Sequence, residues 1–389
     1  IGSGELVQLS GERSVETSTN FRGMTIHGRT IFVDKMGAAQ ADGSIDSPTN
    51  NIASDDVLSA FSVARFGDQV RIVGNGGIDG DIETEADNFS YQFGITETGG
   101  QVLEDGRNME VPQGVTAVID AGAALKFRSA RIGVGSSSLQ VDRSGSLLQV
   151  LGTPRLVELS TDNDVNDPAF DPTTTLLTHV SDATSAYDNG SVILTSMRDR
   201  GVDVAAAGIA PAAGPGDWGG IVFRSDFDAV QGRSSLEDEG IFVDRVNHAE
   251  IRFGGGSNLL IDSVQQLVNP ITMIGRRPTI SFNDITRSAD AAISASPDTF
   301  EETTFQGPKF QVAGRFIADY DRVGPDIYSN QLIDNSINGL FIRVQTTANQ
   351  PPRELTVAGR FDDIDVVHYL AENLSIVGTP GGSIEDGIR

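Results

Sequence analysis

One motif occurs twice, in register, in the last third of the chain. Residues 277–293 and 324–340 share five positions at a constant spacing of 47 residues: Pro278 and Pro325, Ile280 and Ile327, Asn283 and Asn330, Ile285 and Leu332, Ile293 and Leu340. Short alternating segments closed by polar corners indicate strands and not a helix. A spacing of this size fits two turns of a coil of roughly 20–29 residues, so the motif predicts stacked β coils.

The asparagine of this motif has a predicted role of its own. In a parallel stack, Asn283 and Asn330 would face inward and join a ladder of amides that satisfies the carbonyl groups of the corners. Ligand binding by the same amides is the alternative. Because the spacing places the two asparagines two coils apart, the ladder would need a further residue from the coil between them.

Short strand patterns occupy much of the rest of the chain. Apolar runs separated by Gly or Ser occur at 115–119, 125–127, 132–134, 139–141 and 147–150. Strands this short and this closely spaced are typical of successive faces of a coil and not of a sandwich with long hairpins.

A helix is predicted at residues 55–66. Ser54 is a suitable N-cap, and Leu58, Phe61 and Ala64 lie on one face. A stack of parallel strands exposes unpaired strand edges at its end, and a helix packed there would cap them. An ordinary surface helix is the alternative.

Two stretches resemble bacterial β-helix proteins. The order of strand, Gly/Asp loop, proline, short helix and strand over 30–73 resembles the opening of right-handed parallel β-helix proteins of bacterial surfaces. Thr-Ser-x-x-Asp at 195–199, followed by Gly-Asp-Trp-Gly-Gly-Ile-Val-Phe at 216–223, resembles a recurrent signature of such proteins. Trp218 lies between glycines and is predicted to pack at a corner, with stacking on a sugar as the alternative.

Together with 111–154, 216–256 and the two asparagine-containing coils at 277–293 and 324–340, these stretches resemble the giant secreted β-helix surface proteins of planctomycete-type bacteria. The resemblance implies an all-β fold, a right-handed parallel β-helix (solenoid) with a short N-terminal capping helix and inserted polar loops. It also implies a structural segment of a large extracellular or cell-surface protein, such as a filament, an envelope matrix or an adhesin.

The expected organisation follows from the same patterns. Residues 1–29 are expected to be lead-in strands or the end of a preceding unit, and 30–389 to form the β-helix. Inserted loops are expected near 160–190 and 200–216. Because Ile-Val-Gly-Thr-Pro at 376–380 resembles an internal stretch at 150–154, the β-helix is expected to continue beyond residue 389.

The charge of the chain excludes one class of partner. Asp and Glu number 54 against 28 Lys and Arg, a net charge of -26, whereas nucleic-acid binding needs a basic surface. Only Lys35, Lys126 and Lys309 are lysines, and an acidic, lysine-poor surface stays hydrated in salt and offers carboxylates to divalent cations.

Cysteine is absent, which excludes disulfides and zinc–thiolate sites. No apolar run is long enough to span a membrane.

Calcium is the one cofactor that the sequence indicates. The loop at 162–167 concentrates oxygen ligands, and we expect Asp162, Asp164 and Asp167 to bind Ca²⁺ and to rigidify the loop. The loop is not an EF-hand, because its sixth position is Asp167 and not glycine. A solvated acidic loop is the alternative.

Catalysis is the rival hypothesis, because β-helices host polysaccharide lyases and hydrolases. Such chemistry needs clustered carboxylates with a histidine or a basic partner. Asp362 and Asp363 are adjacent but lack such partners, Arg276 and Arg277 lie inside the repeated motif, and the histidines have no metal-ligand spacing. We therefore predict a non-enzymatic segment that acts by shape. Its expected partners are copies of itself or neighbouring segments of the same long chain, with extracellular polysaccharide as a second class.

Overall fold

The computed structural model describes the chain in segments. They are residues 17–21, 24–35, 56–74, 88–96, 100–153, 190–203, 211–233, 237, 242–261, 264–301, 325–344, 354–355, 357, 359, 361, 363 and 365–376.

Three sheets of parallel strands dominate the described residues. The first sheet contains β3 (Thr30–Val33), β4 (Gln69–Ile72), β7 (Thr116–Asp120), β10 (Leu147–Leu151), β13 (Arg245–Asn247), β18 (Thr279–Ser281) and β21 (Asp326–Tyr328). The second contains β5 (Tyr91–Gly94), β8 (Ala124–Arg128), β11 (Val192–Ser196), β14 (Ala249–Arg252), β19 (Asp284–Thr286) and β22 (Gln331–Ile333). The third contains β6 (Met109–Glu110), β9 (Ile132–Val134), β12 (Ile221–Arg224), β17 (Ile271–Ile274), β20 (Ala291–Ala295), β23 (Ile337–Ile342) and β25 (His368–Tyr369).

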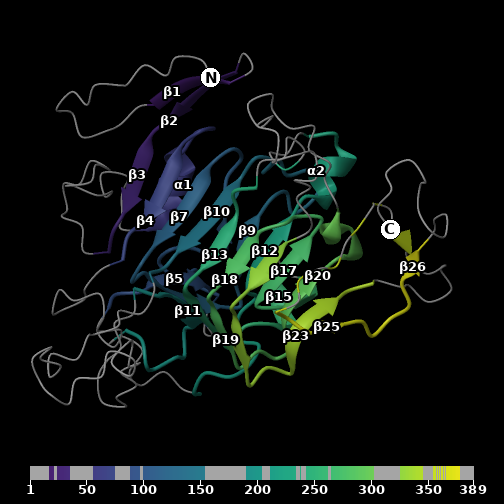
Figure 1. Cartoon of the computed structure of the whole chain (residues 1–389). Coiled ribbons are helices and arrows are strands. Elements are labelled where there is room, and N and C mark those ends of the chain that lie inside the picture. Colours follow the sequence, from purple (N-terminus) through teal and green to yellow (C-terminus); the bar gives the residue numbers. More distant parts are fainter. Residues whose placement is uncertain are drawn as a thin grey trace, which may run out of the picture.

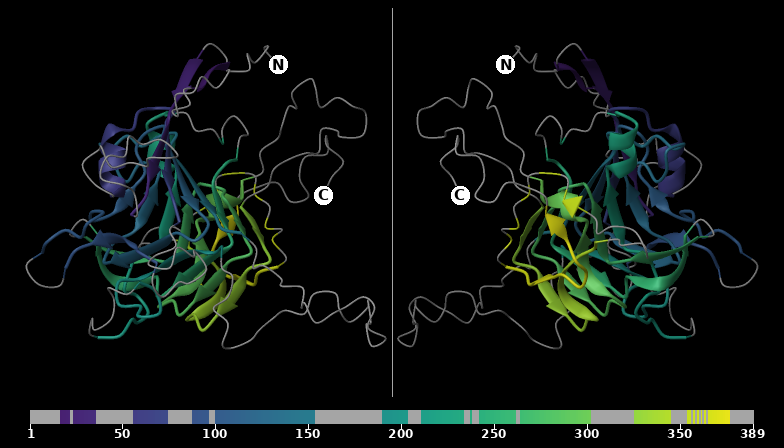
Figure 2. Two further views of the ribbon diagram at one scale, coloured as in Figure 1. Left: turned by 90° about the vertical axis from the view of Figure 1, so that its left-hand side faces the viewer. Right: turned by 90° about the vertical axis from the view of Figure 1, so that its right-hand side faces the viewer.

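The chain visits the three sheets in a repeated order. It passes through β4, β5 and β6, then through β7, β8 and β9, and each strand pairs in parallel with its counterpart in the next set. We call one such set of three strands a layer. The layers lie side by side in sequence order from β3 toward β23 (Figure 1), and Figure 2 shows the same succession from both sides. The prediction of an all-β fold built on parallel strands is confirmed.

The core lies between the sheets and is built from aligned apolar columns. Along the first sheet, the register places six aliphatic side chains on top of one another, all of them at most 3% exposed: Ile72, Ile119, Val150, Val246, Ile280 and Ile327. Burial of each such side chain stabilises the fold by about 1.5–3 kcal/mol. In a parallel sheet, every in-register pair extends the column by one residue, so the column continues for as long as the layers do.

The repeat spacing predicted from the sequence is wrong. Thr279 pairs directly with Asp326 and Asp284 with Gln331, so 47 residues separate adjacent layers and not every second layer. The β4 and β7 strands are also 47 residues apart, whereas the remaining neighbours in the first sheet are offset by 39, 31, 96 and 34 residues. The physical reason is that segments of different length are inserted between the strands, while the strand pairing is unaffected by them. Residues 302–324 form such a segment in the sequence and lie outside the described residues.

The helix α1 spans Val57–Val63, and its N-cap is Asp56 and not Ser54. The Asp56 carboxylate accepts a hydrogen bond from the Ser59 N–H. Val57, Ala60 and Phe61 are the buried residues of the helix. The predicted inward face was therefore wrong for Leu58, which is 40% exposed. The helix packs against β3 and β4, at the edge of the first sheet.

The remaining elements lie outside the three sheets. They are the antiparallel pairs β1 (Thr17–Phe21) with β2 (Met24–Gly28) and β15 (Gly256–Ile261) with β16 (Val264–Val268), the parallel pair β24 (Glu354–Leu355) with β26 (Ser375–Ile376), the helix α2 (Asp226–Val230) and the 3-10 helix η3 (Pro297–Phe300). The β15–β16 hairpin was not predicted. Gly255 precedes the hairpin and Gly256 is its first residue, with φ of +78° and +129°, a conformation that favours glycine.

Candidate functional site

The predicted calcium ligands lie outside the described residues. Asp162, Asp164 and Asp167 belong to residues 154–189, which the structure does not describe. Within the described segments, no group of three or more His, Asp and Glu side chains is arranged to hold a metal ion. The calcium hypothesis therefore stays a prediction.

Trp218 is a packing residue. Its side chain is fully buried, and its ring stacks on Phe127 with centroids 4.5 Å apart. Phe127 stacks in turn on Phe93 at 5.2 Å. The indole Nε1–H donates to the carbonyl of Arg252 at 2.8 Å, which satisfies its one donor. The predicted packing role is confirmed, and a sugar-stacking platform at this residue is excluded because no face of the ring is accessible.

The two asparagines of the repeated motif form the predicted amide ladder, and they contact each other without an intervening residue. Asn283 Nδ2 donates to Asn330 Oδ1 at 2.9 Å and to the carbonyl of Val246 at 2.9 Å. Asn283 Oδ1 accepts the backbone N–H of Ala249, and Asn330 Nδ2 donates to the carbonyl of Ile280. These amides satisfy backbone groups at the corner between the first two sheets. No intervening residue is needed, because the two layers are adjacent.

The two neighbouring arginines of that motif are held in buried ion pairs. Arg276 Nε lies 2.6 Å from Asp244 Oδ2, and Arg277 Nε lies 3.3 Å from Glu237 Oε2. All four side chains are at most 8% exposed. Burial raises the pKa of both Asp244 and Glu237. Each guanidinium is thus enclosed with its own carboxylate, an arrangement that links layers and presents no basic group to a substrate.

Lys126 is also enclosed. Its side chain points outward from β8 beneath the turn at 197–203, where its Nζ donates to the carbonyls of Asp199 and Val202, both at 2.7 Å. Burial lowers the pKa of Lys126 to about 8. The lysine therefore fixes this turn to the outer face of the second sheet.

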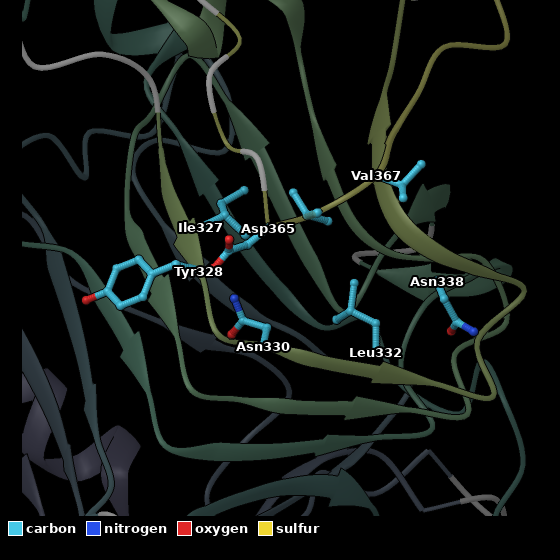
Figure 3. A pocket seen from close by; sticks show the side chains of 8 residues that line it. Ile327, Tyr328, Asn330, Leu332, Asn338, Asp365 and Val367 are labelled. Atoms are coloured by element: carbon cyan, nitrogen blue, oxygen red, sulfur yellow. The ribbon is translucent and has the colours of Figure 1, made fainter.

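One open cavity among the described residues lies beside β21 and β22, and we call it the terminal cavity. Its volume is about 210 Å³. Eight residues line it: Ile327, Tyr328, Asn330, Leu332, Asn338, Asp365, Val366 and Val367. The side chains of Ile327, Leu332 and Asp365 converge on the cavity, whereas the Tyr328 ring points to the outer side of β21 (Figure 3).

The terminal cavity lies where the apolar columns of the core end. Ile327 continues the column of the first sheet, and Leu332 is the counterpart of Ile285 in the second. Beyond β21 and β22, no further strand of these two sheets occurs in the described part of the chain. In this layer Ile327 is 3% exposed, whereas Leu332 is only partly buried.

Two aspartates occupy the position that a further strand would take along β21. Asp363 Oδ1 accepts the N–H of Ile327 at 3.0 Å, and Asp365 Oδ2 accepts the N–H of Ser329 at 3.2 Å. These two N–H groups point away from β18, since alternate residues of a strand face opposite neighbours. The carboxylates thus satisfy edge donors that would otherwise pair with a strand.

The rim of the terminal cavity is apolar and exposed. Val367 is 73% exposed, and Tyr328 is 41% exposed. Ile333, on the neighbouring β22, is 44% exposed. The terminal cavity thus has a mixed lining, with the polar side chains of Asn330, Asn338 and Asp365 beside the apolar ones, and exposed apolar side chains lie at its rim. The repeated motif in the sequence predicts that Ile327 and Leu332 point inward. It does not predict that they lie at the end of the first two sheets as the structure describes them.

Comparisons with known proteins give no family for the chain: no protein-family model, curated protein or solved structure matches it. Among the helices of the described residues, none combines the length and the apolar character needed to cross a bilayer.

Proposed function

We propose that the chain is a right-handed parallel β-helix that serves as a structural segment of a large extracellular or cell-surface protein. Support for the β-helix comes from the repeated visit to three parallel sheets and from the single core between them. Right-handed crossovers join parallel strands in about 98% of cases, which favours this hand. The helix α1, packed on β3 and β4, would cap the N-terminal side of the stack.

The observation that carries the functional proposal is the open last layer. Its terminal cavity, its apolar rim and the edges of β21 and β22 fit the next layer of a stack, supplied by a second copy or by a neighbouring segment. Backbone groups of a parallel stack are paired internally, so its ends are the natural points of association. The segment would thus act in a filament, an envelope matrix or an adhesin by shape and end-to-end contact.

The test uses two valines of almost equal exposure. Val367 on the terminal cavity is 73% exposed and Val230 on α2 is 74% exposed, so Val367→Glu and Val230→Glu introduce the same charge with little effect on folding. Sedimentation velocity should show concentration-dependent assembly of the wild-type chain. Val367→Glu should weaken it by about tenfold or more, because a carboxylate would have to be desolvated at the contact. Equal behaviour of the two variants, or a wild-type chain that stays monomeric, would refute end-to-end association.

Cell fractionation tests the location independently of assembly. Recovery of the protein from the envelope or extracellular fraction is expected, and recovery from the cytoplasm would reject the proposal. Depolymerisation of an acidic polysaccharide by the purified protein would instead favour the lyase or hydrolase hypothesis.

A further inference from the structure

Two oppositely charged side chains meet in a buried position near α1. Lys35 lies two residues after the end of β3, and Asp105 lies in the turn between β5 and β6. The Lys35 Nζ is 2.9 Å from Asp105 Oδ2, with the side chains 6% and 0% exposed. Lys35 is one of only three lysines in a chain with 54 acidic residues. Its enclosure beside the fully buried Asp105 carboxyl group therefore places a rare amine next to a potential acyl group.

The contact differs from an ordinary hydrogen-bonded ion pair. Lys35 Nζ lies within 2.9 Å of the carboxylate but outside the angular range of a hydrogen bond. Both carboxylate oxygens are instead hydrogen-bonded to the backbone: Oδ1 accepts the N–H of Val57 at 3.2 Å, and Oδ2 accepts the N–H of Gln92. The carboxyl group is thus held in place by N–H donors that would stabilise negative charge on oxygen, while the amine nitrogen remains beside it.

The surroundings supply the remaining requirements of an acyl transfer. Burial raises the pKa of Asp105 to about 6, which makes its protonated form accessible near neutral pH. Glu104 Oε2 lies 3.3 Å from the Lys35 Nζ, and its side chain is 55% exposed. This second carboxylate can take a proton from the amine and exchange protons with solvent. The ring of Tyr91, 5.5 Å from the Nζ, covers the pair on another side.

We propose that Lys35 and Asp105 condense into an intramolecular isopeptide bond. The Lys35 ammonium first passes one proton to the Asp105 carboxylate, which gives an amine and a carboxylic acid. The amine nitrogen then attacks Cγ and forms the C–N bond, while the carbonyl electron pair moves to Oδ1, which the Val57 N–H holds. Glu104 takes the second proton from nitrogen and delivers it to the Oδ2 hydroxyl, which leaves as water.

The fold favours this condensation for two reasons. Two buried charges become one neutral amide, which removes the cost of keeping them out of water. The amine and the carboxyl group are also fixed within contact distance, which replaces an encounter in solution by a step within the fold. The product would join the end of β3 to the turn before β6. Because Asp105 also binds the Val57 N–H, it would fix the start of α1 in a chain without cysteine.

Mass spectrometry of the full chain tests the bond. The folded wild-type protein should be lighter than its sequence by the mass of one water. Trypsin should yield a branched peptide that joins residues 30–65 to 72–107, with Lys35 uncleaved. The Lys35→Arg variant keeps the charge but cannot form the bond, and should have its full sequence mass. Asp105→Asn should lose one ammonia in place of water, a result that a mere ion pair cannot produce.

Glu104, which carries the proton in the proposed reaction, provides a second and independent test. Glu104 is largely exposed, so Glu104→Gln should fold normally while the mass loss after refolding is slower by about 100-fold or more. A wild-type chain of full sequence mass, with trypsin cleaving after Lys35, would overturn the proposal and leave only an ion pair. Equal rates of mass loss in wild type and Glu104→Gln would overturn the assigned role of Glu104.

Discussion

Replacement of Asp244 by asparagine isolates the contribution of one buried ion pair to the stack. Asp244 Oδ1 accepts the N–H of Leu148 at 2.7 Å, and Oδ2 lies 2.6 Å from Arg276 Nε. Arg276 also donates to the carbonyl of Ser146. The pair therefore joins the segments that lead into β10, β13 and β18, three successive strands of the first sheet. Asparagine keeps the shape and the acceptor for Leu148 but removes the charge.

The expected loss follows from burial. At 2.6 Å and an effective dielectric constant of about 20, the two charges attract each other by roughly 6 kcal/mol. Part of this attraction is offset by desolvation of both groups. Removing one partner leaves the Arg276 cation buried and uncompensated, which typically costs about 3–5 kcal/mol. The free energy of unfolding of Asp244→Asn should therefore fall by about that amount.

A pair of the same geometry on the surface serves as the control. Arg71 Nε lies 2.6 Å from Asp120 Oδ2, but these side chains are 45% and 19% exposed. Urea denaturation should give a loss below about 1 kcal/mol for Asp120→Asn. Adding Arg276→Met to Asp244→Asn should recover part of the larger loss, because the uncompensated charge is then removed. Equal losses at the two sites would refute the argument that burial decides the magnitude.

Three further measurements test other parts of the structure. Burial lowers the pKa of Lys126 to about 8, so the unfolded state binds the proton of this lysine more tightly than the folded state does. Between pH 8 and pH 10.5, the free energy of unfolding of the wild type should therefore rise by about 3 kcal/mol relative to that of Lys126→Met. Parallel pH curves for the two proteins would contradict this. Asn283→Ala removes a fully buried amide and should destabilise the fold by about 2–4 kcal/mol. The matched Asn335→Ala, at a partly exposed position of the next corner, should cost less, and the reverse order in urea denaturation would exclude the ladder as the cause. Trp218 is the only tryptophan and is fully buried, so its fluorescence should resist acrylamide quenching until the chain unfolds.

Strand positions could be predicted because the apolar alternation of these segments is local. The runs at 115–119, 125–127 and 132–134 correspond to β7, β8 and β9 within one residue at each end. Each strand buries its inward side chains whatever follows it, so the pattern is readable without knowledge of the partners. The spacing of the layers could not be read in this way. It depends on segments inserted between strands, and these change the sequence distance without changing the pairing.

The corners were harder to predict than the strands. Between the first and second sheets, His248, Phe282 and Ser329 occupy equivalent positions, with φ of 49°, 57° and 55°. None is glycine, although this conformation costs other residues about 1–2 kcal/mol. Asn283 and Asn330 follow two of these residues and satisfy backbone groups there, which offsets the cost. A search for corners by glycine alone misses such turns, because the stabilising group comes from the adjacent layer.

The distribution of charge bears on how such segments could meet. Arg131, Arg276, Arg277 and Lys35 have side chains at most 6% exposed, so part of the small basic content is enclosed within the fold. Arginines such as Arg71 stay exposed, but acidic residues outnumber basic ones by 54 to 28, so lateral contact between two copies would on balance bring like charges together. The terminal layer differs, since Ile327 and Leu332 line its cavity beside polar side chains and the carboxylates of Asp363 and Asp365 accept the edge N–H groups of β21. Screening by salt weakens the lateral repulsion but changes apolar burial much less. The proposed end-to-end contact should therefore depend less on ionic strength than a lateral contact would.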